Sequence, residues 1–497
     1  MRTGTRKSLF GVIMVASMLL PASGAAITYT GVNLAGADFG APPFGTMPGT
    51  FGNEYTYPGS FEIDYFISKG AHTFRLPFRW ERLQPTLGAP FDQAEFERLK
   101  DFVNEATDKG GYVVLDPHNY ATYWIADMAY RIGSSEVTIA HFEDFWERLA
   151  EEFQGNSQVI FGLMNEPIGQ TGGSQGAAIT TEQWLAAANA AIAAIRSTGA
   201  SNLILVPGNG YTGGSTWFNN WYGTPNAQVM LSVVDPGNNW AFDIHQYFDE
   251  DGSGTDVAIS TSVGVDRLSA ITGWLRENGM RAFLGEWGMA NNSTDFQAGT
   301  NMLQFLANNS DVWIGWTYWA AGPWWGEYIY TVQPRVQGQI IIDRPQLAVM
   351  SSFFVEPSSG PEPGSFLFWV EQNFTLSDRA DPLISGLTAT PNGDGVNNLM
   401  KYFLGVGAFE SAQAFLPQLS LDDTDLVLTF WLDPEQQGAT ETVWWSENLT
   451  QWYDTDISIE PIGISAGRHG FEARVARGVR SQLFMRLVVS PTADLGL

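Results

Sequence analysis

The sequence predicts an α/β protein in which a (β/α)8 TIM barrel is followed by a small β-rich, sandwich-like C-terminal domain. Three observations carry this prediction. Eight short apolar runs alternate with helical patterns between residues 27 and 318, as in a barrel of parallel strands. A Pro/Gly/Ser-rich stretch then separates two regions of different composition. Beyond that stretch, alternating apolar and polar residues replace the continuous runs, which is typical of half-buried strands.

The eight runs are nearly continuous in apolar residues, as expected for strands that are buried on both faces. They are Ile27–Leu34, Thr73–Phe78, Tyr112–Asp116, Val159–Met164, Leu203–Val206, Ala241–Ile244, Ala282–Leu284 and Trp313–Tyr318. An open, doubly wound sheet is the rival fold. Its first turn would be expected to carry the pattern G-x-G-x-x-G, whereas residues 31–36 read GVNLAG.

Amphipathic helices are predicted between the runs. Apolar residues at positions 142, 145, 146, 149 and 153 have the spacing of one helix face. Similar spacing predicts helices over residues 184–195 and 268–275, and Gly199 and Gly279 follow them, as glycine does at many helix ends. We interpret these faces as packing surfaces between the helices and the barrel.

Residues 1–25 have the composition of a secretory signal peptide. Arg2, Arg6 and Lys7 precede a short apolar run over residues 8–20, and small residues at 21–26 provide a cleavage site. The apolar run is too short to span a bilayer comfortably. We therefore expect a secreted protein that leaves the membrane after cleavage, with an uncleaved N-terminal anchor as the alternative.

The remaining chain divides into three parts. The barrel domain is expected over residues 26–354, a Pro/Gly/Ser linker over 355–365, and a β-rich accessory domain over 366–497, whose role the sequence leaves open. Only one helix is expected in the accessory domain, near Asn398–Leu404.

Composition narrows the function classes. The 53 acidic residues outnumber the 25 basic ones, for a formal net charge of −28. A nucleic-acid-binding protein needs a dense basic footprint, and an anionic membrane repels so acidic a chain, so neither partner is expected. The chain has no cysteine, which excludes disulfides and thiolate metal sites. Its 19 tryptophans favour a neutral partner that contains sugar rings.

Two glutamates come shortly after predicted buried strands. Glu166 follows the fourth run and Glu286 follows the seventh. In a barrel of this class, the chemistry lies at the carboxyl ends of the strands, and a charged group there is costly unless it is paired or functional. Glycoside hydrolysis needs one protonated carboxyl group beside the leaving oxygen and one ionised carboxylate below the anomeric carbon, about 5 Å apart in retaining enzymes.

Polar motifs close six of the runs in chain order. They are Arg75-Leu76-Pro77, His118-Asn119-Tyr120, Asn165-Glu166-Pro167, His245-Gln246-Tyr247, Gly285-Glu286-Trp287 and, after the eighth run, Trp319. This set resembles glycoside hydrolase family 5, and within it the endoglucanases (cellulases) of subfamily 5, over residues 28–350. The segments 31–36, 161–167 and 206–209 strengthen the resemblance.

The resemblance implies a secreted endo-β-1,4-glucanase that hydrolyses cellulose or soluble β-glucans with retention of configuration. Glu166 would be the general acid/base and Glu286 the nucleophile of a covalent glycosyl-enzyme, with no cofactor and no metal. The supporting or substrate-binding residues would be Arg75, His118, Asn119, Asn165, His245, Tyr247 and Trp319. Of these, Asn165 would bind the sugar 2-hydroxyl, and Trp319 would stack under the sugar. Arg75 and Tyr247 would hold Glu286 ionised and oriented.

Several alternatives stay open at this point. An endo-acting hydrolase on mannan, xyloglucan or xylan would use the same mechanism, because specificity depends on loop shapes. A non-catalytic polysaccharide-binding protein, or an adhesin dominated by the C-terminal domain, would share the fold. The glutamates could be structural partners of Arg75, and His118 and His245 could bind a metal with Glu166, although H-x-x-x-H spacing is absent. We expect a monomer.

Tryptophans in or near the predicted loops are candidates for stacking on outer sugar units. They are Trp80, Trp124, Trp217, Trp240 and Trp324, with Trp221 and Trp325 in similar positions. Packing within the loops is the alternative for each of them.

The C-terminal domain opens on a turn-rich motif. Residues 390–399, TPNGDGVNNL, resemble the motif D-P-D-G-D-G-x-x-N-L that precedes small β domains in many secreted proteins. A Ca²⁺ loop needs oxygen ligands at alternating positions and a bidentate carboxylate at the twelfth. Here Thr390 and Asn392 replace acids, Lys401 occupies the twelfth position, and only Asp394 keeps its charge, which argues against Ca²⁺ binding.

Overall fold

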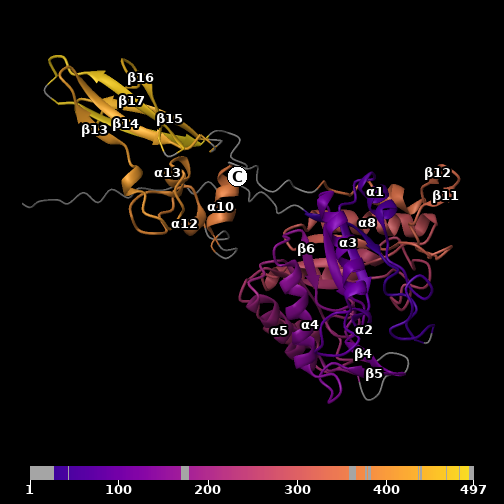
Figure 1. Cartoon of the computed structure of the whole chain (residues 1–497). Helices are drawn as coiled ribbons and strands as arrows, with labels where there is room; N and C mark the ends of the chain where they lie inside the picture. Colours follow the sequence, from indigo (N-terminus) through magenta and orange to yellow (C-terminus); the bar gives the residue numbers. More distant parts are fainter. Residues whose placement is uncertain are drawn as a thin grey trace, which may run out of the picture.

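The computed structural model of the chain (Figure 1) describes residues 27–42, 44–169, 178–356, 365–374, 378, 382–434, 436, 439–465, 467–480 and 482–491. The predicted signal peptide and residues 357–364 of the predicted linker lie outside the described residues. Both assignments, and the domain boundaries that depend on them, stay predictions.

Eight parallel strands close into a barrel, which confirms the predicted fold class. The strands are β1 (Tyr29–Leu34), β2 (Thr73–Phe78), β3 (Tyr112–Pro117), β6 (Val159–Gly162), β7 (Ile204–Pro207), β8 (Trp240–His245), β9 (Ala282–Glu286) and β10 (Trp313–Ala321). Their order around the barrel is β1-β10-β9-β8-β7-β6-β3-β2, which follows the chain. Two short hairpins project from the loops: β4 (Thr122–Ile125) with β5 (Met128–Arg131), and β11 (Arg335–Gln337) with β12 (Ile340–Ile342).

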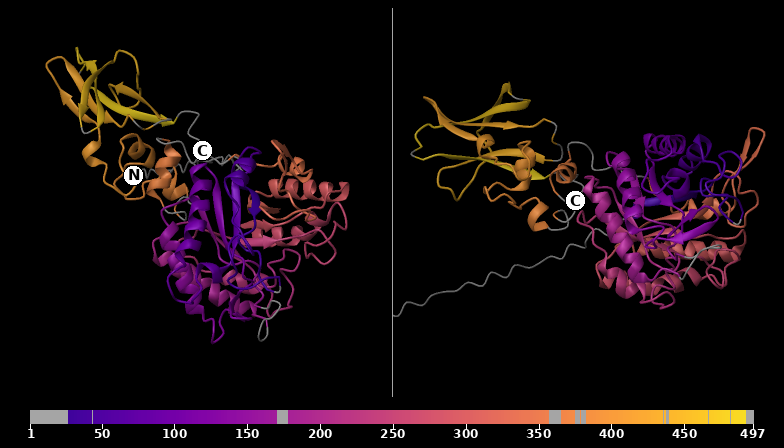
Figure 2. Two further views of the ribbon diagram at one scale, coloured as in Figure 1. Left: turned by 45° about the vertical axis from the view of Figure 1, so that its right-hand side comes forward. Right: turned by 60° about the horizontal axis from the view of Figure 1, so that its bottom comes forward.

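Helices surround the barrel (Figure 2). They are α1 (Ser60–Ile67), α2 (Trp80–Leu83), α3 (Gln93–Asp108), α4 (Ile139–Phe153), α5 (Thr181–Ser197), α6 (Asn226–Val229), η1 (Met230–Ser232), α7 (Val263–Glu277), α8 (Ser293–Asn308) and α9 (Gln346–Met350). Side chains of Asp92, Thr138, Thr180 and Asn292 accept backbone N–H groups at the starts of α3, α4, α5 and α8. The three helices predicted from periodicity lie within α4, α5 and α7.

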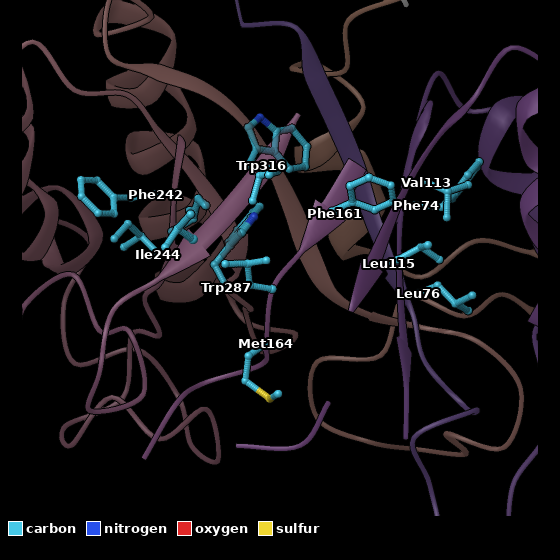
Figure 3. Close-up of a cluster of buried hydrophobic side chains, with 14 of the residues drawn as sticks. Phe74, Leu76, Val113, Leu115, Phe161, Met164, Phe242, Ile244, Trp287 and Trp316 are labelled. Atoms are coloured by element: carbon cyan, nitrogen blue, oxygen red, sulfur yellow. The ribbon is translucent and has the colours of Figure 1, made fainter. Parts of the chain in front are cut away.

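The two faces of each barrel strand carry different side chains. On β3, Val113 and Leu115 belong to the core between the barrel and the helices, whereas Val114 belongs to a second cluster inside the barrel. Figure 3 shows part of the outer core, where Phe74 and Leu76 of β2 lie beside Val113 and Leu115. Because strand side chains alternate, a polar residue at the inward position of a strand end is directed into the barrel mouth.

The C-terminal part contains two antiparallel sheets. One has the order β13 (Gln418–Leu421), β14 (Asp425–Leu432), β17 (Arg468–Ala476) and β16 (Ser458–Ser465), and the other pairs β15 (Ala439–Ser446) with β18 (Phe484–Pro491). Leu428 and Phe430 of β14 share a buried cluster with Trp445 and Met485 of the second sheet. The two sheets therefore pack face to face, in agreement with the sandwich-like prediction.

The C-terminal part is more helical at its start than we predicted. The expected helix is present as α13 (Asn398–Phe403), but α10 (Phe366–Asn373), α12 (Pro382–Ser385) and the turn η2 (Gln413–Phe415) accompany it. Phe366, Trp369 and Tyr402 form their common core. The sequence FLFWVEQN of α10 is apolar on several sides and only two turns long, so its periodicity could not distinguish a helix from a buried strand. Among the described residues, each helix is too short or too polar to cross a membrane.

Candidate active site

Glu166 and Glu286 meet at the carboxyl end of the barrel. Glu286 is the last residue of β9 and is 4% exposed, whereas the Glu166 side chain, in the loop after β6, is 16% exposed. A carboxylate oxygen of each glutamate and one ring nitrogen of His245 all lie within 4.8 Å of one another. An upper limit of 4.8 Å between one oxygen of each carboxyl group fits the separation of about 5 Å in retaining glycosidases better than the longer separation in inverting ones.

The backbone at Glu166 adopts a left-handed conformation. Its φ angle is 41°, a region that non-glycine residues enter at a cost of about 1–3 kcal/mol. Neighbouring hydrogen bonds hold this turn: the N–H of Asn165 donates to the carbonyl of Pro117 at 2.9 Å, and the N–H of Tyr120 donates to the carbonyl of Asn165 at 3.0 Å. Strain of this kind concentrates at functional sites, where it fixes a side chain in one direction.

Arg75 places a fixed positive charge beside Glu286. It is 1% exposed on β2, and its Nη1 donates to Oε1 of Glu286 at 2.8 Å. Nη1 also lies 3.1 Å from Oδ2 of Asp116, and Nη2 donates to Oδ1 of Asn165 at 2.7 Å. Burial opposes the guanidinium charge, but the nearby carboxylates, Asp116 first, outweigh it and hold the pKa of Arg75 above its usual value.

Tyr247 holds the other oxygen of the same carboxylate. Its hydroxyl donates to Oε2 of Glu286 at 2.8 Å, and its ring stacks on Tyr330 with 6.0 Å between the ring centroids. Burial and the adjacent Glu286 raise the pKa of Tyr247 well above its usual value, so the phenol remains a donor. Glu286 is therefore held at Oε1 by Arg75 and at Oε2 by Tyr247.

Replacing Tyr247 with phenylalanine tests this contact. Tyr247→Phe keeps the ring and removes one hydrogen bond to a charged group, so we expect kcat/KM to fall roughly 10- to 100-fold. Steady-state hydrolysis of cellopentaose measures the effect. Tyr65→Phe is the matched control, because that hydroxyl donates to Asp343 away from the site. An unchanged kcat/KM in Tyr247→Phe would mean that the contact does not support catalysis.

Glu166 has the electrostatics of a general acid. Burial raises its pKa to about 8, and the partial offset by Arg75 does not restore the ordinary value. Nδ1 of His245 lies 2.8 Å from Oε1 of Glu166 and 3.5 Å from Oε2 of Glu286. Burial lowers the pKa of His245, so the imidazole is neutral at neutral pH. Glu166 is thus protonated at pH 7.

This protonation state predicts the alkaline limb of the pH profile. The raised pKa means that Glu166 keeps its proton at neutral pH and loses it as the pH rises through about 8. We expect kcat/KM to fall above about pH 8 and to approach a tenfold loss per pH unit. A pH series of kcat/KM on a soluble substrate measures the limb. A limb near pH 5 would show that Glu166 titrates like an ordinary carboxyl group.

His118 is fixed at the edge of the site. Its Nδ1 lies 2.8 Å from Oδ2 of Asp116, and Nδ2 of Asn165 lies 3.1 Å from its Nε2. Burial lowers the pKa of His118 to about 4, so the ring is neutral at pH 7. The ring stacks on Trp319, with centroids 5.3 Å apart and planes at 16°. Trp319 itself is half-buried and lies near the end of β10.

Asn119, which we expected among the substrate-binding or supporting residues, contacts Glu81 and the backbone of Trp80 in this structure. It is fully buried, and its Nδ2 donates to both carboxylate oxygens of Glu81 at 2.8 Å. Its Oδ1 accepts the backbone N–H of Trp80 at 2.9 Å. Because its amide is committed to these partners, Asn119 connects the end of β3 to α2 and offers no free group to a sugar.

An open cleft extends from Glu166 along the barrel mouth. It has a volume of about 420 Å³. Tyr211 and Trp221 line it, and they are 44% and 64% exposed. Tyr247 and Asp251 line it from the loop after β8. The cleft therefore combines exposed aromatic faces with the carboxyl group of Glu166, and Tyr247, which holds Glu286, also lines it.

The five tryptophans that we predicted as outer sugar-binding candidates differ in burial and in position. Trp80 and Trp217 are completely buried among aromatic neighbours, so neither presents a face to a sugar in this structure. Trp240 begins β8 and lies at the opposite end of the barrel from the carboxyl groups. Trp124 is 6% exposed and lines a separate cavity of about 440 Å³, and Trp324 is 52% exposed. Trp221, outside those five, is the tryptophan that lines the cleft beside Glu166.

Two tryptophan variants separate packing from substrate contact. Trp217→Ala should lower the free energy of unfolding by about 3–5 kcal/mol, because it empties a fully buried site. Trp221→Ala should leave stability nearly unchanged and raise KM roughly 3- to 10-fold through the loss of a stacking face. Urea unfolding and steady-state kinetics measure the pair. Equal stability losses in the two variants would contradict the assignment.

The cluster of Glu166, His245 and Glu286 has a spacing that a cation could bridge. Arg75 already supplies a positive charge 2.8 Å from Glu286. In addition, Tyr247 donates to the remaining oxygen of Glu286. Both oxygens of one carboxylate therefore have protein donors, and we assign the cluster to acid–base and nucleophilic chemistry.

Four buried residues that support the site were not among our candidates. Asp116 and Asp243 lie two residues before His118 and His245, and Asn33 is paired in register with Arg75 and accepts from its Nη1 at 2.9 Å. Strand alternation could have identified these inward positions. The fourth residue, Glu81, lies on the short helix α2, and no sequence pattern marks it.

An eight-stranded parallel barrel with two neighbouring carboxyl groups at its carboxyl end, one with a raised pKa, is the arrangement that a glycoside hydrolase needs. A family model described as cellulase (glycosyl hydrolase family 5) matches residues 30–322. The chain belongs to this family and is a glycoside hydrolase.

Known relatives share the barrel region. Endo-beta-1,4-glucanase A of Emericella nidulans is 39% identical over 331 residues, which cover 66% of this chain and 93% of the relative. The structure of XacCel5A in complex with cellopentaose is 47% identical, with a TM-score of 0.61, and covers 66% of this chain and 99% of that one. The endo-beta-1,4-glucanase Xac0029 of Xanthomonas axonopodis pv. citri is 43% identical, with a TM-score of 0.61, covering 67% of this chain and 100% of that one.

Proposed function

We propose that the protein is a retaining endo-β-1,4-glucanase that cuts cellulose or soluble β-glucans within the chain. One observation carries the mechanism: a carboxyl oxygen of Glu166 lies within 4.8 Å of one of Glu286. The contacts of Arg75 and Tyr247 with Glu286, and the raised pKa of Glu166, support the two roles. The named activity of the relatives supports the substrate class. The open cleft with exposed Tyr211 and Trp221 suits a polymer that extends beyond the cleavage point.

The reaction proceeds in two displacements. Glu166 donates its proton to the glycosidic oxygen while Glu286 attacks the anomeric carbon, so the C–O bond breaks and a glycosyl ester forms on Glu286. Glu166, now ionised, takes a proton from water, and the hydroxide attacks the same carbon. The ester bond breaks and Glu286 leaves as a carboxylate. Two inversions return the product to the β configuration.

Arg75, Tyr247 and Asn165 orient the reacting groups. Arg75 and Tyr247 aim Glu286 at the anomeric carbon, and Arg75 also holds Oδ1 of Asn165. We propose that Nδ2 of Asn165, which lies near His118, binds the sugar 2-hydroxyl in the transition state. Trp319, half-buried beside His118, would stack under the sugar at the cleavage point.

Reducing-end release from a panel of polymers tests the substrate. We expect release from carboxymethylcellulose and barley β-glucan, and its loss in Glu286→Ala on the same substrates. Release from glucomannan or xylan alone would be consistent with the proposed mechanism, but it would show that the substrate is not a β-1,4-glucan. No release from any polymer would contradict the proposal and favour a binding role.

We further propose that the protein is secreted as a monomer, with the barrel and the C-terminal part as separate domains joined by residues 355–365. The N-terminal signal-like segment supports secretion. Separate buried clusters in the two parts support independent folding. Truncation after residue 355 should therefore leave the hydrolysis of soluble β-glucan unchanged.

A further inference from the structure

The loop over residues 390–401 contains a buried lysine where a metal loop would carry its last acid. Lys401, on α13, is 0% exposed. Lysine is almost never fully buried unless its charge is paired. The position is the twelfth of a segment whose oxygen-bearing side chains recur at alternating residues, as in a Ca²⁺ loop.

Three oxygen atoms surround the Lys401 ammonium. Its Nζ donates to the carbonyl of Ala408 at 2.7 Å and to the carbonyl of Glu410 at 2.8 Å. Oδ2 of Asp394 lies 3.3 Å away as the ion-pair partner. An ammonium group has three protons to donate, so each proton has one acceptor. The distances are those of N–H···O contacts and exceed the 2.3–2.6 Å of Ca²⁺–oxygen bonds.

The side-chain oxygens of Asp394 and Asn392 have protein donors as well. Oδ1 of Asp394 accepts the N–H of Val396 at 3.0 Å, and Oδ2 accepts the N–H of Ala412 at 3.0 Å. Burial opposes the charge of Asp394, but these backbone donors and Lys401 outweigh it and lower the pKa to about 2. Oδ1 of Asn392 accepts the N–H of Asp394 at 3.2 Å.

We propose that residues 390–401 form a cation-binding loop whose cation is the chain's own Lys401 ammonium, so that the loop takes no Ca²⁺. One buried ammonium balances one carboxylate, and two backbone carbonyls complete its surroundings. The contact ties α13 to the turn at 408–412, which leads into the first sheet. Nδ2 of Asn392 donates to the same carbonyl of Glu410 at 2.8 Å and strengthens this connection. This loop therefore needs no metal ion to keep its conformation.

Thermal unfolding of the full chain, with and without Ca²⁺, is the first test. We expect the midpoint of each unfolding transition to be the same in excess EDTA and in excess Ca²⁺. Any small difference should be the same in the wild type and in Asp394→Asn. Lys401→Met should lower the midpoint of one transition by about 10 °C, because it leaves the partly buried carboxylate of Asp394 without its cation. Lys100→Met is the matched control, since that side chain is 44% exposed. A midpoint that rises with Ca²⁺ in the wild type, and no longer does so in Asp394→Asn, would overturn the proposal.

A double-mutant cycle shows whether Lys401 acts through its charge or only by filling space. If the ammonium balances Asp394, then Asp394→Asn should cost less in the Lys401→Met background than in the wild type. Additive losses would overturn the proposal, as would a Lys401→Met variant as stable as the wild type. Should Lys401→Met fail to fold, the Ca²⁺ comparison of the wild type with Asp394→Asn decides the question.

Discussion

Glu286→Ala should abolish the hydrolysis of β-glucan while the barrel remains folded. Without the carboxylate, no glycosyl ester can form, and we expect kcat to fall by about 10⁴-fold or more. Glu286 is buried, and its removal leaves Arg75 and Tyr247 without their shared acceptor. The exposed Tyr211 and Trp221 still line the cleft in this variant, so β-glucan binding should persist. Kinetics on barley β-glucan and binding by affinity electrophoresis measure the two effects.

Two comparisons make the Glu286 prediction specific. Glu250→Ala makes the same change at an exposed residue of the neighbouring loop and should retain full activity. In Glu286→Ala, azide can enter the vacated space and attack the anomeric carbon of an aryl β-glucoside with a good leaving group. The product would be the α-glycosyl azide, formed by a single inversion. Full activity in Glu286→Ala without azide would remove the nucleophile assignment.

Glu166→Gln should slow the reaction in a manner that depends on the leaving group. The variant cannot protonate the glycosidic oxygen, so we expect hydrolysis of cellopentaose to fall about 10²- to 10⁴-fold. An aryl cellobioside whose leaving group needs no proton should form the glycosyl ester at a nearly normal rate. Burst kinetics with this substrate measures the first step directly.

The same variant should also change the pH profile. If Glu166 is the group with a pKa of about 8, its replacement removes the alkaline limb of kcat/KM. The neutral side chain of Gln cannot titrate, and no other group in the site is assigned that role. An alkaline limb that persists in Glu166→Gln, together with equal losses on both substrates, would assign the acid role to another residue.

The barrel and its two carboxyl groups could be predicted because their signals are local. Each strand is a continuous apolar run, and Glu166 and Glu286 follow or close runs where a charge has no structural reason to be. The contacts of Arg75 and Tyr247 with Glu286 depend on the register of the strands and on side-chain alternation around the closed barrel. That arrangement brings Arg75 and Asp116 together from different strands.

Which loop tryptophans would be buried could not be predicted, for a physical reason. A loop tryptophan can turn its indole into the core or toward solvent, and the sequence around Trp217 and Trp221 does not distinguish the two outcomes. The structure buries Trp217 against Phe242 and leaves Trp221 in the cleft. Asn119 shows the same limit, because its partner Glu81 lies on a short helix that no pattern marks. Loop packing, unlike strand order, depends on contacts between distant residues.

The anomeric configuration of the first product tests the central claim most directly. Proton NMR during the first minutes of cellopentaose hydrolysis, before mutarotation, distinguishes the two anomers of the newly formed reducing end. Two carboxyl groups within 4.8 Å, with Glu286 as nucleophile, predict that the β anomer appears first. Initial accumulation of the α anomer would contradict the account, since it would require a single displacement by water and a different role for Glu286.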